Sequence, residues 1–161
     1  MPGVSPEQGP SGLGNPLDAG PVGRAMSEIA TLLNEGDPLI AVVGATDDPT
    51  KYGATIYRDL KRKGYRVVAV NDRRDRVDGD PAYRDLRSLP ERPDIVDIVV
   101  PPASAAAVVE DGLELGLERF WLQPGAESPA IVERLVAAGV DHLVNACIMT
   151  RSRVRRGDGV G

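Results

Sequence analysis

The sequence predicts an α/β fold, a doubly wound parallel sheet of five strands in a three-layer sandwich with helices on both faces. Short apolar runs, rich in valine and isoleucine, alternate with helical patterns of about a dozen residues. The clearest run, residues 39–43, is too short for a helix and has no polar alternation, which favours a strand buried on both faces. Each run is followed by a glycine, a proline or a polar loop.

Composition excludes several classes of function. The chain has 161 residues, a net charge of −5 and a pI near 4.9, so a nucleic acid is not expected as a partner. It has no run of 18 apolar residues that could span a membrane and no recognisable secretory signal. One cysteine, Cys147, and one histidine, His142, favour neither an internal disulfide nor a histidine-rich metal site. We therefore expect a cytoplasmic, metal-free protein.

Glycine and proline content divides the chain. Residues 1–24 are rich in both and are predicted to be a disordered tail. Residues 151–161 hold several arginines among glycines and are predicted to be a second, basic tail. A single folded domain is expected over residues 25–150.

Within that domain, apolar spacing and end signals predict the elements in order. Helices are expected at 25–35, from Tyr52 to Gly64, at 103–115, and from Ser128-Pro129, an N-cap followed by a first-turn proline, to Gly139. Strands are expected at 39–43, 66–70, 95–100, 119–122 and 141–145. The polar, proline-punctuated segment 71–94 is expected to be a long connection.

Right-handed crossovers leave few topologies, of which we favour strand order 3-2-1-4-5 counted along the core sheet. The 95–100 strand, which follows the long polar connection, should lie beside the first strand across the switch point. Ligands of such sheets bind outside the carboxyl ends of the strands, where the order reverses. This rule gathers residues 44–46, 71–73, 101–102, 123–125 and 146–147 along one rim.

The loop after the first strand is predicted to bind a phosphate. Gly44 ends the strand and a helix begins near Tyr52, so unpaired N–H groups and the positive end of a helix dipole face the loop. The dinucleotide fingerprint G-x-G-x-x-G lacks its second and third glycines here, and the Walker motif is absent. Asp72 could imitate the ribose-binding acid, but the arginines that follow suit an adenosine with an extra phosphate (Arg73, Arg74 and Arg76).

Five short motifs at the expected strand ends carry a family resemblance. They are Gly44-Ala45-Thr46 with Pro49 and Lys51-Tyr52-Gly53, then Val70-Asn71, Val100-Pro101-Pro102, Trp121-Leu122-Gln123-Pro124-Gly125 and Ala146-Cys147-Ile148. In this order, over about residues 25 to 150, they resemble the stand-alone CoA-binding proteins of the YccU-like family. They are also similar to the CoA-binding domain of succinyl-CoA synthetase alpha subunits.

The resemblance implies a coenzyme A site in which each motif has a role. Gly44, Ala45 and Thr46 would lie along the CoA phosphates, with Lys51 supplying charge. Tyr52 and Gly53 of the same motif would also belong to the binding site. Asn71 and Arg73 would border the adenosine end, Pro101 and Pro102 would form an apolar wall, and Gln123 and Gly125 would face the pantetheine arm. No catalytic residue and no metal ligand is predicted.

The expected function is non-catalytic binding of CoA or an acyl-CoA, as a carrier or regulator; any protein partner is unknown. One alternative is an NAD(P)-binding oxidoreductase-like domain, although no Tyr-x-x-x-Lys pair is present. Another is an accessory module of an acyl-CoA synthetase, whose phosphorylatable histidine would belong to a further domain. Cys147 should lie near one flank of the ligand crevice, either as a buried small hydrophobe or as a thiol that forms a mixed disulfide with CoA.

Overall fold

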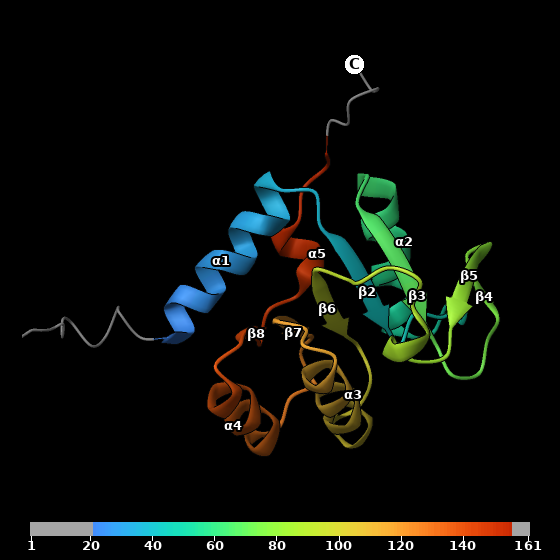
Figure 1. Cartoon of the computed structure of the whole chain (residues 1–161). Coiled ribbons are helices and arrows are strands. Elements are labelled where there is room, and N and C mark those ends of the chain that lie inside the picture. The colour runs from blue at the N-terminus through green and yellow to red at the C-terminus, as the bar shows by residue number, and fades with distance from the viewer. Residues whose placement is uncertain (1–20, 156–161) are drawn as a thin grey trace, which may run out of the picture.

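The computed structural model describes residues 21–155 and shows a single sheet between two helical layers (Figure 1). The strands are β2 (Leu39–Val43), β3 (Arg66–Val70), β4 (Arg76–Val77), β5 (Asp80–Tyr83), β6 (Ile95–Ile98), β7 (Arg119–Leu122) and β8 (Asp141–Val144). The helices are α1 (Pro21–Glu35), α2 (Tyr52–Lys63), α3 (Pro102–Glu114), α4 (Pro129–Ala138) and α5 (Ile148–Arg151), with a 3-10 turn η1 (Leu86–Ser88).

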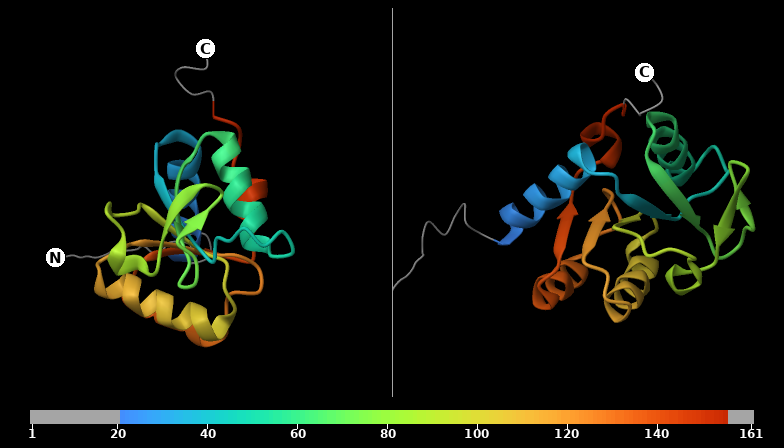
Figure 2. Two further views of the ribbon diagram at one scale, coloured as in Figure 1. Left: turned by 90° about the vertical axis from the view of Figure 1, so that its right-hand side faces the viewer. Right: turned by 45° about the horizontal axis from the view of Figure 1, so that its top comes forward.

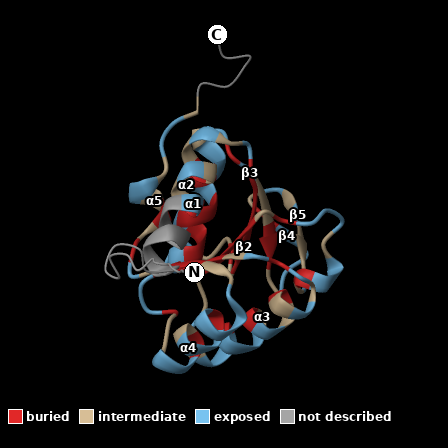
Figure 3. Ribbon diagram, turned by 60° about the vertical axis from the view of Figure 1, so that its left-hand side comes forward, coloured by how far each residue is buried: buried red, intermediate tan, exposed pale blue. Residues whose placement is uncertain are grey.

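Each face of the sheet has its own apolar core. Helices α1, α2 and α5 cover one face, where Leu33, Leu60 and Ile148 pack over alternate strand residues such as Val42 and Trp121. Helices α3 and α4 cover the other face, and Figure 2 shows the two layers on opposite sides of the strands. The strands are the most buried part of the molecule, and the outward faces of the helices are exposed (Figure 3). The predicted parallel three-layer α/β fold is confirmed.

The sheet has seven strands in the order β4-β5-β3-β2-β6-β7-β8, which is two more than predicted. The 95–98 strand lies beside the first strand, as expected, with Ile40 opposite Ile95. If the five predicted strands are numbered in chain order, however, they lie in the sheet as 2-1-3-4-5, so the predicted order 3-2-1-4-5 is wrong for them. The place beside the second strand, predicted for strand 3, is occupied by β5, which pairs in parallel with the end of β3.

The two additional strands form a hairpin inside the segment predicted as a connection. β4 and β5 pair antiparallel, with Val77 opposite Asp80. The Lys61 ammonium of α2 lies 3.0 Å from an Asp78 carboxylate oxygen and 2.9 Å from an Asp80 oxygen. Asp80 also accepts a 2.8 Å hydrogen bond from the hydroxyl of Tyr57, which is buried. These contacts hold the hairpin against α2 and fix where the chain leaves β5.

Both ends of the described part lie within a few residues of the limits predicted for the domain, 25 and 150. Helix α1 begins at Pro21 rather than Ala25, and residues 1–20 and 156–161 lie outside the described part. Residues 151–155 belong to the fold: the Arg155 guanidinium carbon lies 5.0 Å from the centre of the Tyr65 ring. The same guanidinium donates to the backbone carbonyls of Leu33 and Gly36 near the end of α1.

Candidate functional site

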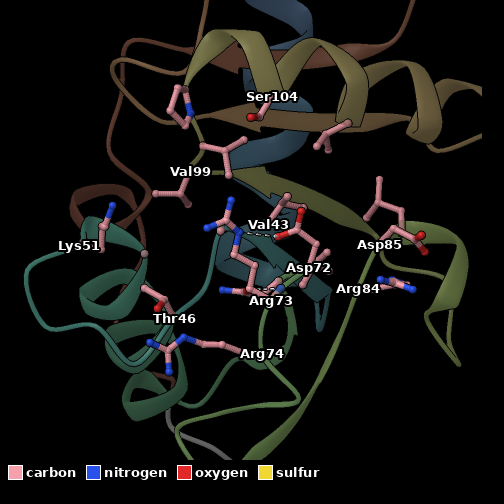
Figure 4. Close-up of a pocket in the computed structure, with 18 of the residues that line it drawn as sticks. Val43, Thr46, Lys51, Asp72, Arg73, Arg74, Arg84, Asp85, Val99 and Ser104 are labelled. Carbon is pink, nitrogen blue, oxygen red and sulfur yellow. Dashed lines mark hydrogen bonds and ion pairs between the residues drawn. The ribbon is translucent and has the colours of Figure 1, made fainter.

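A pocket of about 1040 Å³ lies at the carboxyl ends of four neighbouring strands, β2, β3, β5 and β6. Its walls come from the loops that follow these strands and from one face of α3, and Figure 4 shows their side chains converging. Apolar side chains, among them Val43, Val99 and Val100, line one part of it, and charged side chains line the rim. The pocket includes the switch point of the sheet, because β2 has its neighbours β3 and β6 on opposite sides.

Two glycines bring the loop after β2 and the start of α2 into contact. Gly44 has a φ of +106°, a left-handed conformation that side chains rarely adopt, and its N–H donates to the Val70 carbonyl at 2.9 Å. A Cβ atom on Gly53 would lie only 2.0 Å from the Gly44 carbonyl oxygen. The first turn of α2 therefore lies directly against the glycine turn, which requires glycine at both positions.

The polar residues of this loop are held by local hydrogen bonds. The Thr46 hydroxyl accepts from the Asp48 N–H at 3.1 Å, and Asp48 accepts from the Thr50 hydroxyl and N–H at 2.7 and 3.0 Å. The bond from the Thr50 hydroxyl is the main cause of a lowered pKa at Asp48. The Asn71 side-chain amide donates to the Ala45 carbonyl at 2.8 Å and ties the loop to the end of β3. The loop is therefore preformed.

The start of α2 is suited to an anion. Its N-cap residue, Lys51, has an extended backbone and makes no side-chain capping hydrogen bond, and the first turn contains no acidic residue. The first N–H groups of any helix have no acceptor within the helix, and its N-terminus carries partial positive charge. At this helix start the Ala54 N–H donates to the Lys51 carbonyl at 3.1 Å, and the residues between them, Tyr52 and Gly53, line the pocket together with Lys51. A phosphate is the typical ligand of such an arrangement.

Cys147 lies next to this helix start without lining the pocket. Its sulfur is 3.2 Å from the hydroxyl oxygen of Tyr52, and that contact is the main cause of a raised pKa at Tyr52. Cys147 is half-buried, which lies between the buried hydrophobe and the accessible thiol that the sequence allows.

The structure brings eight of the twelve predicted site residues together in the pocket lining: Gly44, Thr46, Lys51, Tyr52, Gly53, Asn71, Arg73 and Pro101. Four lie outside it: Ala45, Pro102, Gln123 and Gly125. Ala45 is fully buried beneath the loop, and Gly125 lies in the exposed turn after β7. The rim predicted from the loops of all the strands is thus shifted toward β5 and away from β7 and β8.

Gln123 is the clearest difference from prediction. Only 1% of it is exposed; its amide nitrogen donates to Asp97 at 2.6 Å, and its amide oxygen accepts from the Ile148 N–H at 3.2 Å. Both ends of the amide are thus used inside the protein, so this side chain does not face the pocket. Burial of the Asp97 carboxyl raises its pKa to about 7, even though the Gln123 bond acts in the opposite direction.

Other pocket residues were not predicted. Ser104, Val108 and Asp111 line it from α3, and their spacing of four and three residues places them on one helix face, which helical periodicity could have indicated. Arg84 and Asp85 line it from the loop after β5. Their position depends on a strand that the apolar pattern does not predict.

Two further properties concern the described residues alone. They contain no group of three or more histidine, cysteine, aspartate or glutamate side chains that could hold a metal ion. No helix among them is both long and apolar enough to span a membrane.

Comparison with known proteins shows which family the chain resembles. A family model described as "CoA binding domain" matches residues 39–153. The alpha subunit of acetate–CoA ligase (ADP-forming) II from Pyrococcus furiosus is 41% identical over 63 residues; the match covers 38% of this chain but only 14% of that protein. The structure of a conserved hypothetical protein from Pyrococcus furiosus superimposes with a TM-score of 0.68 and 42% sequence identity. The match covers 70% of this chain and 97% of that protein's chain. The structure of acetyl-coenzyme A synthetase 1 of Candidatus Korarchaeum cryptofilum superimposes with a TM-score of 0.62 and 25% sequence identity. The match covers 81% of this chain and 31% of that protein's chain.

Proposed function

Because the chain belongs to the family of CoA binding domains, which its residues 39–153 match, we propose that it binds coenzyme A or an acyl-CoA in the pocket at the end of β2. We further propose that it holds this ligand without transforming it. The observation that carries the proposal is the start of α2, where the first helical turn, a glycine turn and Lys51 meet at the pocket and no side chain caps the helix.

The diphosphate of CoA is the part of the ligand that this helix start suits. Gly44 and Gly53 have no side chains that would obstruct the diphosphate, and Thr46 and Lys51 line the pocket beside them. Asn71 and Arg73 then lie on the side of the adenosine, and Pro101 contributes an apolar wall. We assign no ligand contact to the buried Gln123.

Holding rather than catalysis is supported by the composition of the lining. Among the described residues, the lining contains neither a histidine nor a cysteine, the side chains that most often act as general base or thiol nucleophile near neutral pH. One of its four aspartates, Asp48, has a lowered pKa, because it accepts hydrogen bonds from Thr50. A lowered pKa suits an ionised turn residue better than a proton donor.

Calorimetric titration with CoA, acetyl-CoA and NAD tests the ligand. We expect CoA and acetyl-CoA to bind more tightly than NAD, because the single-glycine loop lacks the close backbone approach of the dinucleotide motif. Binding of NAD as tight as that of CoA would overturn the CoA assignment and favour the oxidoreductase-like alternative.

A second candidate function is that of an accessory module of an acyl-CoA synthetase. It is favoured by the 41% identity with an acetate–CoA ligase alpha subunit, of which the chain spans only a small part. Incubating the protein with acetate, CoA and magnesium-ATP, both alone and together with the remaining domains of an acetate–CoA ligase, and measuring ADP separates the two. We expect no ADP above the background without acetate; acetate-dependent ADP would contradict a purely holding role.

A further inference from the structure

The cations around the pocket differ in whether a carboxylate already neutralises them. A guanidinium nitrogen of Arg74 lies 3.8 Å from an Asp47 oxygen. Arg73 lies 3.9 Å from an Asp72 oxygen, and its side chain is 90% exposed. Arg84 also lines the pocket, yet among the described residues it has no carboxylate within ion-pairing distance. Arg84 is therefore the rim arginine whose charge is still available to a ligand.

The backbone fixes where Arg84 starts. In the pairing of β3 with β5, Val70 lies opposite Tyr83, and the Asn71 N–H donates to the Tyr83 carbonyl at 2.8 Å. Arg84 is the next residue, so it leaves the sheet beside the loop that begins at Asn71. Figure 4 shows Arg84 and Lys51 at opposite sides of the pocket.

The acid nearest to Arg84 in sequence is already engaged. Asp85 is the N-cap of η1, and one of its carboxylate oxygens accepts from the Ser88 N–H at 2.9 Å and from the Ser88 hydroxyl at 2.7 Å. Another acid of the lining, Asp111, lies 3.3 Å from a guanidinium nitrogen of Arg87. Within residues 21–155, the Arg84 guanidinium is therefore a fork of donors without a protein acceptor.

A guanidinium in this position matches a phosphate monoester, whose oxygens accept two parallel hydrogen bonds from it. The pocket thus offers two separate anion sites, one at the start of α2 and one after β5. We propose that Arg84 determines specificity for ligands that carry a second phosphate apart from the diphosphate, such as the ribose 3′-phosphate of CoA. The inference rests on the proposed function, because it assumes that the diphosphate lies at the start of α2.

Arg84 is a better candidate than Arg73 or Arg74, because each of the other two would have to give up an interaction or its side-chain freedom to bind a phosphate. Arg74 would have to leave Asp47, so the ligand would replace one ion pair by another. Arg73 would have to order a side chain that is now almost fully exposed, and exposed ion pairs contribute little after that cost.

The test compares CoA with dephospho-CoA, which lacks only the 3′-phosphate. Wild type, Arg84→Ala, Arg84→Lys and Arg73→Ala are titrated with both ligands in one buffer of low salt. Arg76→Ala is the matched control, because it removes the same charge from the same hairpin but outside the pocket lining. We expect Arg84→Ala to weaken CoA roughly tenfold or more and dephospho-CoA less than about twofold, with Arg84→Lys between wild type and Arg84→Ala. Arg76→Ala and Arg73→Ala should leave the ratio of the two affinities unchanged.

Three results would overturn the inference. Equal losses for both ligands in Arg84→Ala would mean that Arg84 contacts another part of CoA or none. Loss of discrimination in Arg73→Ala, with Arg84→Ala unchanged, would place the phosphate at Arg73. A wild type that binds neither ligand would refute the proposed function itself, and this inference with it, which the first two results would not do.

Discussion

Replacing Asp97 by asparagine should make the protein more stable at alkaline pH. Asp97 lies in the middle of β6, is 0% exposed, and one of its carboxylate oxygens has no hydrogen-bond partner among the described residues. Burial of this carboxyl raises its pKa from 3.8 to about 7. Asparagine has nearly the same shape, can accept the same hydrogen bond from Gln123, and does not ionise.

The sign and size follow from proton linkage. Well below pH 3.8 the carboxyl is protonated in both the folded and the unfolded protein, so it adds no pH dependence there. Between its unfolded and folded pKa values only the unfolded state loses the proton, so the free energy of unfolding falls as pH rises. Between pH 5 and the folded pKa of about 7, two units at about 1.36 kcal/mol each give a loss of about 3 kcal/mol, which then stays constant. Asparagine avoids this loss.

Urea unfolding from pH 5 to pH 8.5, followed by the fluorescence of the single tryptophan, measures the effect. Trp121 is a suitable probe, because it is fully buried and lies opposite Asp97 in the pairing of β6 with β7. Subtracting the unfolding free energy of wild type from that of Asp97→Asn at each pH cancels the contributions of the other titrating groups. We expect the difference to grow by about 3 kcal/mol in favour of the variant. A difference that does not change with pH would refute a raised pKa at Asp97.

Three further predictions concern the loop and the chain ends. Lys51→Ala should weaken CoA binding by about 1.5–3 kcal/mol in calorimetry, whereas Arg62→Ala, the same charge change at the other end of α2, should not; equal effects would show general electrostatics alone. Gly53→Ala should lower both the thermal midpoint and CoA affinity, because its Cβ would lie 2.0 Å from a carbonyl oxygen; an unchanged midpoint would contradict that contact. Arg155→Ala should cost about 1–3 kcal/mol of unfolding free energy in urea, and the exposed Arg153→Ala little; equal costs would mean that the contacts of Arg155 contribute nothing specific.

The sheet and its switch point could be predicted because their signals are local. The apolar run at 39–43 is buried at every position, and Ser128-Pro129 begins α4 as its sequence indicates, with the Ser128 hydroxyl accepting from the Ile131 N–H at 3.2 Å. The glycine of the loop after β2 likewise indicated a turn that other residues disfavour. These features depend on the side chains of the segment itself.

The β4–β5 hairpin could not be predicted in this way. Pro81 interrupts β5, and none of the four residues of that strand is fully buried, so apolar alternation is absent. The strand exists because its backbone continues the sheet from β3 and because Lys61 and Tyr57 of α2 bind Asp80. This information lies in segments distant in sequence. The position of Arg84 at the pocket could not be predicted either, because Arg84 directly follows β5.

The buried position of Gln123, outside the pocket lining, has a different cause, which is the register between neighbouring strands. The sequence indicated that a buried Asp97 needs a partner, and it separately placed Gln123 at the ligand. Asp97 lies opposite Trp121, and residues two apart on a strand share a face, so Gln123 follows on the face that carries Asp97. A shift of one residue would turn Gln123 to the other face and leave the carboxyl without its donor. The register relates two strands that α3 separates in sequence, so the composition of either strand does not reveal it. A polar residue just past a buried strand can therefore satisfy a neighbouring strand as readily as a ligand, and a buried carboxylate next to it in the sheet favours the first role.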